Sequence, residues 1–220
     1  LSHITGIFSS TLGALANFVI ILFVGIYLAI GARTYTDGLV RLFPFERRPR
    51  AREVIDELGF TLWWWLLGKS AAMIVVALIT WLVLTLLGVP LALTLGLLAG
   101  LLDFIPNIGP FLAGIPAVLI ALSVSPMTAL YVLIFYFLIQ SVESYILTPI
   151  LLKKTVELPP AVTISAQVLL GVLVGGLGLV LASPLAAAIF VLVRMLYLED
   201  TLGEKIVKPS EKDEADNDDE

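Results

Sequence analysis

Two polar clusters interrupt long apolar stretches of this 220-residue chain. The first contains Asp103 and Asn107, within the sequence Asp-Phe-Ile-Pro-Asn-Ile-Gly-Pro that ends at Pro110. The second pairs Gln140 with Glu143, which lie three residues apart and therefore share one face of a helix. A carboxylate is costly in apolar surroundings, so these groups are candidates for binding a cation, a proton or a polar solute. We take these four side chains as the candidate substrate- or ion-binding residues, with the first pair ranked first.

Each candidate also has a structural interpretation, which the sequence leaves open. Asp103 could sit at a water-exposed turn or cap the following helix, and Glu143 could reach water near the inner interface. Thr163 and Gln167 share a helix face, for which interhelical hydrogen bonding is the favoured explanation.

Signatures of common enzyme classes are missing from the sequence. There is no cysteine, and the single histidine is His3, so thiolate catalysis and a His-Glu-x-x-His zinc protease are excluded on this stretch. The segment from Gly68 to Ser70 resembles the end of a phosphate-binding loop, but Trp63 stands where that loop needs glycine. With no Gly-x-Ser-x-Gly motif either, we predict a protein that is not an enzyme and needs no cofactor or metal.

The composition is typical of a membrane protein. Apolar residues make up 59% of the chain and charged residues 14%, with a mean hydropathy of +1.03, whereas a soluble domain has about 25% charged residues. The acidic net charge comes from the end of the chain, so residues 208–220 are expected to form a disordered cytoplasmic tail. No basic patch with interleaved aromatic residues is present, and a nucleic-acid partner is not expected.

The first part of the chain is expected to hold one transmembrane helix and a basic region. An uncharged run long enough to cross a bilayer ends before Arg33, so residues 1–32 are assigned to that helix. Residues 33–68 hold six arginines, then an acidic turn and three consecutive tryptophans, which predicts a cytoplasmic basic loop and an amphipathic interfacial helix. Because the chain starts at Leu1 and the apolar run follows almost at once, we expect further sequence before it.

The segment 91–122 is the most informative part of the chain. Two apolar arms of about 13 residues flank the Asp103 motif, and each arm is too short to span a bilayer. Pro106, Gly109 and Pro110 must break the helix between them. Broken backbone is tolerated in a membrane only against protein or water, so the segment is either a re-entrant hairpin or a broken crossing helix.

The core, residues 69–207, combines full spans with interrupted blocks. The expected spans are 70–87 and 127–147, and the interrupted blocks are 91–122 and 161–198. Pro149 is expected to end the second span, and Pro184 to break the second block. Both blocks open near a proline, and the surrounding charges place their re-entry on opposite sides of the membrane. This is the pattern of an inverted repeat with the site where the broken helices meet.

These motifs together resemble a known family. Residues 101–117, Leu-Leu-Asp-Phe-Ile-Pro-Asn-Ile-Gly-Pro-Phe-Leu-Ala-Gly-Ile-Pro-Ala, are similar to the signature of the autoinducer-2 exporter (AI-2E) family of transporters. The Gln-x-x-Glu motif followed by a proline (140–149), the glycine-rich stretch ending in a proline (171–184) and Leu-Leu-Gly-Val-Pro (86–90) resemble further family motifs. The resemblance covers residues 12–207, and family members are usually longer at the N-terminus.

The resemblance implies an all-α polytopic protein of the inner membrane, with the basic loop and C-terminus in the cytoplasm. It implies a secondary transporter of the autoinducer-2 exporter type, which moves a small polar solute or signal molecule across the inner membrane. A sodium or lithium/proton antiporter is the alternative within transport, and a non-transporting membrane scaffold is the alternative from another class. The expected partners are the lipid bilayer, a small polar solute or cation, H⁺ or Na⁺ as coupling ion, and further copies of the chain.

Overall fold

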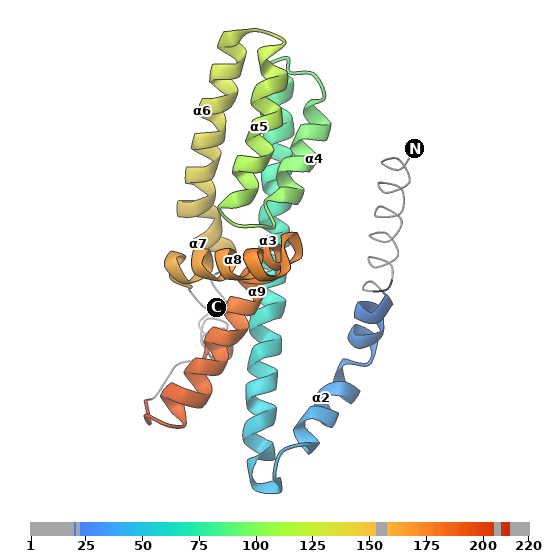
Figure 1. Ribbon diagram of the computed structural model, residues 1–220, viewed down its shortest axis with the longest axis vertical. Helices are drawn as coiled ribbons and strands as arrows, with labels where there is room; N and C mark the ends of the chain where they lie inside the picture. The colour runs from blue at the N-terminus through green and yellow to red at the C-terminus, as the bar shows by residue number, and fades with distance from the viewer. Residues whose placement is uncertain (1–19, 21–22, 153–157, 205–207, 212–220) are drawn as a thin grey trace, which may run out of the picture. The chain divides into compact units, whose positions relative to one another are not determined.

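The computed structural model describes residues 20, 23–152, 158–204 and 208–211 (Figure 1). These residues form helices and turns without any β-strand among them, which confirms the predicted all-α class. Most of the first predicted span, residues 1–32, lies outside the described residues. Three of the described helices are long and apolar enough to cross a membrane, as a polytopic membrane protein requires. They are Phe45–Leu86, Pro126–Leu151 and Gly176–Glu199.

The chain divides into two compact units, residues 1–55 and 56–220. In the first unit, α2 (Ala32–Arg41) is followed by the short 3-10 helix η1 (Phe45–Arg47) and by the start of α3 (Arg48–Leu86). The basic segment that the sequence predicts as a loop is thus mostly helical. Its prolines do not prevent this, because they fall just before η1 and in the first turn of α3, where a missing N–H is tolerated.

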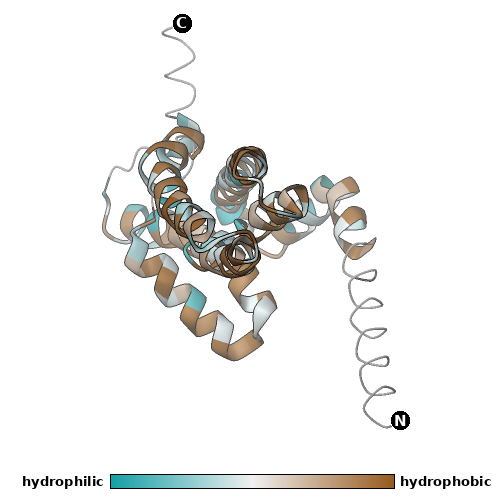
Figure 2. Cartoon of the chain, turned by 90° about the horizontal axis from the view of Figure 1, so that it is seen from above, coloured by the Kyte–Doolittle hydropathy of each residue, from teal (hydrophilic) through white to brown (hydrophobic). Residues whose placement is uncertain are grey.

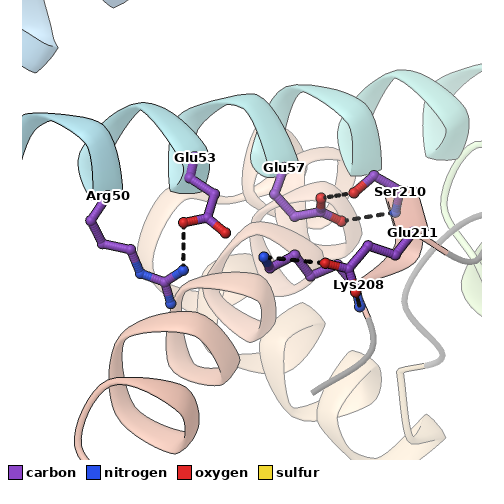
Figure 3. Close-up of polar contacts among 6 residues, drawn as sticks. All are labelled: Arg50, Glu53, Glu57, Lys208, Ser210 and Glu211. Atoms are coloured by element: carbon purple, nitrogen blue, oxygen red, sulfur yellow. Dashed lines mark hydrogen bonds and ion pairs between the residues drawn. The ribbon is translucent and has the colours of Figure 1, made fainter. Parts of the chain in front are cut away.

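Ion pairs tie the basic segment together within the first unit. Arg52 Nη2 lies 2.5 Å from Asp37 Oδ1. Arg50 Nη1 lies 2.8 Å from Glu53 Oε2, as Figure 3 shows. Glu53, the first acidic residue after these arginines in the sequence, therefore pairs with one of them.

Helix α3 joins two elements that the sequence treats separately. The expected interfacial helix and the span 70–87 form one continuous helix of 39 residues, about 58 Å long at the usual rise per residue. Gly68 does not break it but allows a close contact, because a Cβ there would lie 2.4 Å from the Leu151 carbonyl oxygen. The helix exceeds the bilayer core of about 30 Å, so part of it extends beyond the hydrocarbon or the helix tilts.

The segment 91–122 forms a helical hairpin, which we call hairpin 1. Its arms are α4 (Ala92–Leu102) and α5 (Ile108–Leu122), which run side by side in opposite directions (Figure 1). Of the two alternatives left by the sequence, the hairpin is therefore the one that forms. The reversal is completed at Asn107, whose φ of +67° is a left-handed conformation that most side chains avoid.

Small side chains bring hairpin 1 close to its neighbours. Ala113, Ala117 and Ala121 recur every fourth residue on α5 and are 1%, 0% and 0% exposed. They pack in a buried cluster with Val132 of α6 (Pro126–Val142), so the helix axes can approach closely. Leu84 of α3 belongs to the same cluster, which holds the hairpin between α3 and α6.

Residues 160–192 form a second helical hairpin, hairpin 2. Its arms are α8 (Pro160–Val174) and α9 (Gly176–Leu192), and the turn is made by Gly175 with φ +72°. The two arms pack mainly on each other. Figure 2 shows that most residues along these helices are hydrophobic, and many of their large apolar side chains are exposed.

Two prolines were expected to break helices and do not. Pro184 lies inside α9, so the expectation that it interrupts the block 161–198 is wrong. Pro149 lies in α7 (Thr148–Leu151), which continues α6 through the π-helical turn η2 (Glu143–Leu147), so the span extends beyond it. In membrane helices, neighbouring helices and local π-helical turns can satisfy the backbone groups that a proline leaves unpaired. The sequence alone does not reveal these compensating contacts.

The C-terminal region begins with defined contacts. The α9 helix continues as the π-helical segment η3 (Val193–Glu199). Further along, Ser210 donates hydrogen bonds to the buried Glu57 carboxylate, from its backbone N to Oε1 at 3.2 Å and from its hydroxyl to Oε2. Lys208 and Glu211 form an ion pair of 3.4 Å beside it (Figure 3). Residues 208–211, expected in a disordered tail, thus contact α3, and residues 212–220 lie outside the described residues.

Candidate functional site

Three charged side chains from distant parts of the chain meet at the tip of hairpin 1. Lys69 Nζ lies 3.0 Å from Asp103 Oδ2 and 3.1 Å from Glu143 Oε1. They come from α3, from the end of α4 and from the π-helical turn after α6, respectively. Since these are the only charged residues between Glu57 and Lys153 in the sequence, all charges of that stretch converge on one point.

This charged triad (Lys69, Asp103 and Glu143) is almost fully buried. The three residues are 6%, 0% and 6% exposed. Fully ionised, the triad holds one positive and two negative charges and is therefore short of one positive charge. Apart from the ion pair with Lys69, neither Asp103 oxygen accepts a hydrogen bond from any described residue. A buried carboxylate without donors is costly, so this site is suited to take up a proton, a cation or a solute that donates hydrogen bonds.

Local sequence explains how each carboxylate is placed. Asp103 caps the C-terminus of α4, where the helix dipole disfavours a negative charge, so it depends on Lys69 for stabilisation. Glu143 is the first residue of the π-helical turn η2. Such turns displace side chains from regular helix positions and are frequent at functional sites. At this turn the Glu143 side chain is buried, with 6% of the residue exposed.

Gln140, one turn before Glu143, faces a different environment. It lines an apolar groove of about 330 Å³ between α5 and α6, together with Pro110, Gly114 and Tyr136 among others. Its Nε2 lies 3.4 Å from Ser144 Oγ, and its buried Oε1 accepts no hydrogen bond from a described residue. Gln140 thus lies beside the charged triad in sequence but makes no described contact with it.

Asn107 and the residues expected to break the helix, Pro106, Gly109 and Pro110, lie at the tip of hairpin 1. Asn107 is exposed and occupies the N-cap position of α5, and its side chain makes no hydrogen bond to the triad within the described part of the chain. Gly109 is required by packing, because a Cβ there would lie 1.9 Å from the Leu102 carbonyl oxygen of the opposite arm. These residues therefore define the geometry of the turn that presents Asp103.

Two further contacts hold the tip. Gln167 of α8 donates from Nε2 to the Pro106 carbonyl oxygen at 2.7 Å. Trp65 of α3 meets Phe104 edge to face, with ring centroids 5.7 Å apart. The interhelical hydrogen bond expected of Gln167 is thus confirmed, with the hairpin tip as its acceptor.

Sequence reasoning placed Asp103 and Glu143 in the site and missed Lys69. In the structure these two carboxylates meet through the lysine between them. The local pattern around Lys69 resembles only the end of a phosphate-binding loop, which does not predict a role beside the carboxylates. The isolation of this lysine is the signal that points to it, since it is the only basic residue between Arg52 and Lys153. A lone cation and two lone carboxylates in apolar helices are expected to pair.

The described residues contain no group of three or more His, Cys, Asp or Glu side chains that could hold a metal ion. The charged triad places one ammonium group between two carboxylates. Such a cluster can exchange a proton or a monovalent cation while the lysine keeps the remaining charge paired.

Comparisons with known proteins point to transport. The sequence model of the family described as AI-2E family transporter matches residues 1–197. The AI-2 transport protein TqsA of Escherichia coli is 33% identical over 161 residues, which are 73% of this chain and 44% of TqsA. YueF of Bacillus subtilis is 27% identical over 191 residues, 85% of this chain and 52% of YueF. YrrI of the same bacterium is 32% identical over 142 residues, 64% of this chain and 39% of YrrI. The chain spans about half the length of these relatives.

Proposed function

Because this chain belongs to the AI-2E family of transporters, we propose that it forms the core of a secondary transporter that moves a small polar solute across the inner membrane. The relative TqsA is named for AI-2 transport, so an autoinducer-2-like signal molecule is the first solute to test. The proposal includes a cytoplasmic location for the basic segment 33–52, because positively charged segments stay on that side. It also includes assembly from several copies of the chain.

The charged triad is the observation that supports this proposal. Its carboxylates are buried at the tip of a hairpin whose arms are too short to cross a bilayer, which is where many transporters bind their substrates. Lys69 is the only described residue that pairs with the Asp103 carboxylate, so a solute with hydroxyl donors could satisfy its remaining acceptor capacity. We assign Asp103 and Glu143 to solute or ion binding and Lys69 to keeping the two carboxylates together.

The charge balance of the triad supports coupling to H⁺ or Na⁺. One positive charge faces two negative charges, and a single added proton or monovalent cation makes the cluster neutral. A neutral cluster can move through apolar surroundings at a much lower cost than a charged one. Uptake of that ion on one side of the membrane and its release on the other would therefore drive the change in the side to which the site is open.

Transport by the full-length protein in sealed liposomes tests the proposal. Labelled autoinducer-2 is supplied on one side, and its flux is measured for the unmodified protein, Asp103→Asn and Glu143→Gln. Asp37→Asn is the matched control, because it makes the same change at a partly exposed carboxylate of the first unit. We expect each site variant to lower the flux by about tenfold or more, which corresponds to an increase of at least roughly 1.4 kcal/mol in the activation free energy of transport. The flux of the control variant should be unchanged.

The outcomes separate the alternatives. If the Asp103→Asn/Glu143→Gln double variant folds and transports like the unmodified protein, the site assignment is wrong. If a folded unmodified protein carries neither autoinducer-2 nor other small polar solutes, the transport proposal fails and a membrane scaffold is favoured. Imposing a pH or sodium gradient in the same liposomes identifies the coupling ion.

A further inference from the structure

The two hairpins are joined by one polar contact. Gln167 lies in the middle of α8, is 1% exposed, and donates to the Pro106 carbonyl oxygen at the tip of hairpin 1. Within the described part of the chain, this is the only hydrogen bond between hairpin 1 and hairpin 2. The contact lies three residues from Asp103, so hairpin 2 reaches hairpin 1 next to the charged triad.

The Pro106 carbonyl does not need Gln167 to be satisfied. It already accepts a hydrogen bond from the Ile108 backbone N at 2.8 Å. When the hairpins separate, the carbonyl keeps this partner, and only the Gln167 amide must find another one or reach water. The contact is therefore one that can break without leaving the hairpin tip unpaired.

The other contacts of hairpin 1 are of a different kind. Its arms bury small side chains against α3 and α6, and Gly100 fits so closely that a Cβ would lie 2.5 Å from the Met73 carbonyl oxygen. Hairpin 2 packs mainly on itself. If the two hairpins move relative to each other, the contact between Gln167 and Pro106 is the one that must break.

We propose that Gln167 is a positioning residue that holds hairpin 2 against the tip of hairpin 1, and that this hydrogen bond opens and closes in each transport cycle. The inference rests on the proposed transport function and adds the moving contact to it. A transporter must expose its site to one side at a time, so some cover over the site has to come off. A neutral amide–carbonyl bond is well suited to this, since it is weaker than an ion pair and directional.

Covalent linkage across this contact tests the proposal. The chain contains no cysteine, so the pair Asn107→Cys/Gln167→Cys can be joined by a short bifunctional thiol reagent, with any cysteine elsewhere in the full-length protein replaced by serine. Relative to the unlinked double variant, we expect linkage to lower solute flux by about tenfold or more, because conformational steps limit turnover, and cleavage of the link to restore the flux of that variant. Each single-cysteine variant with the same reagent is the control.

A second set of variants separates positioning from folding. Gln167→Leu removes the hydrogen bond but keeps an apolar side chain of similar size, whereas Gln167→Glu keeps the shape and places an acceptor against the Pro106 carbonyl. We expect both to change the maximal rate about threefold or more. For Gln167→Leu, solute affinity and the melting temperature should stay near those of the unmodified protein, whereas the buried carboxylate of Gln167→Glu should also lower the melting temperature. A structural role would instead lower the melting temperature in parallel with the rate.

The results distinguish this inference from the function on which it rests. If the unmodified protein transports solute and the linked pair transports it equally well, the hairpins do not separate and the inference is wrong. If Asp103→Asn abolishes transport while linkage has no effect, the site stands and only the moving contact fails. If the unmodified protein carries no solute, the proposed function fails and the inference is overturned with it.

Discussion

Hairpin 1 and hairpin 2 share one construction but differ at their tips. In both, a glycine near the start of the second arm faces a carbonyl of the first arm. A Cβ built on Gly109 or Gly178 would lie 1.9 Å from the Leu102 or Leu170 carbonyl oxygen, respectively. The turn of hairpin 1 contains Asp103, whereas the turn of hairpin 2 is made by Gly175 and carries no charge. Close arms are thus a shared packing requirement, and the charge is particular to hairpin 1.

The hairpins also differ in how they are held. Hairpin 1 lies between α3 and α6 and carries its tip charge into the charged triad. Hairpin 2 packs mainly on itself, α8 against α9. Both hairpins expose large apolar side chains, such as Leu101 of hairpin 1 and Leu173 of hairpin 2, at 68% and 69%. We propose from this difference that hairpin 1 holds the site and hairpin 2 covers it. The following predictions test that division, starting from the largest expected effect.

Lys69→Met should have the largest effect. It leaves two buried carboxylates without a counter-charge, which is expected to lower the free energy of unfolding by roughly 3–5 kcal/mol. The triple variant Lys69→Met/Asp103→Asn/Glu143→Gln removes all three charges and should regain most of that stability, without regaining transport. Thermal unfolding in detergent and flux in liposomes measure the two quantities. If the triple variant is as unstable as the single one, the triad is not held together by its charges.

Gly109→Ala and Gly178→Ala test the shared construction. Each places a methyl group against a backbone carbonyl, and overpacking of this kind costs about 1–3 kcal/mol. Gly38→Ala is the control, since nothing lies within 4 Å of a Cβ there. We expect similar losses of melting temperature in the two hairpins, with a loss of solute affinity only for Gly109→Ala. Equal effects on affinity would contradict the assignment of the site to hairpin 1.

The contact of Glu57 with Ser210 provides a reference outside both hairpins. Ser210→Ala removes the hydroxyl donor but keeps the backbone N–H, so the loss should be about 0.5–1.5 kcal/mol. We expect the C-terminal segment to become more susceptible to limited proteolysis, while solute affinity is unchanged. A change in affinity as large as that of Asp103→Asn would show that the site extends beyond the hairpin tips.

The smallest effect is expected at Asp37, in the first unit. The hydrogen bond from Arg52 holds the pKa of this carboxyl below its ordinary value of 3.8. Its contribution to stability is therefore present above that value and is lost as the pH falls through the lowered pKa. Arg52→Gln should raise the pKa of Asp37 in an NMR titration and leave transport unchanged. High salt should weaken the pairing, because both side chains are partly exposed.

Much of the fold follows from local patterns. The apolar runs predict helices and a membrane, and the Pro106 and Gly109 break predicts that 91–122 cannot form one ordinary span. The same rules failed at Pro149 and Pro184, because the effect of proline depends on whether neighbouring helices and a π-helical turn replace the missing hydrogen bond. The local pattern also predicts an interfacial helix and a separate span within α3, because the polarity of its residues changes along the helix. The helical backbone nevertheless continues without interruption.

The amino-acid sequence by itself determined that Asp103 and Glu143 are unusual, because a charge in an apolar run is costly wherever the run folds. Only the tertiary structure decided that Lys69 lies between them, that Gln140 faces a separate groove, and that Gln167 reaches the Pro106 carbonyl. The physical reason is distance along the chain. Lys69 and Glu143 are 74 residues apart, so their meeting depends on how helices pack rather than on any local preference of the residues between them.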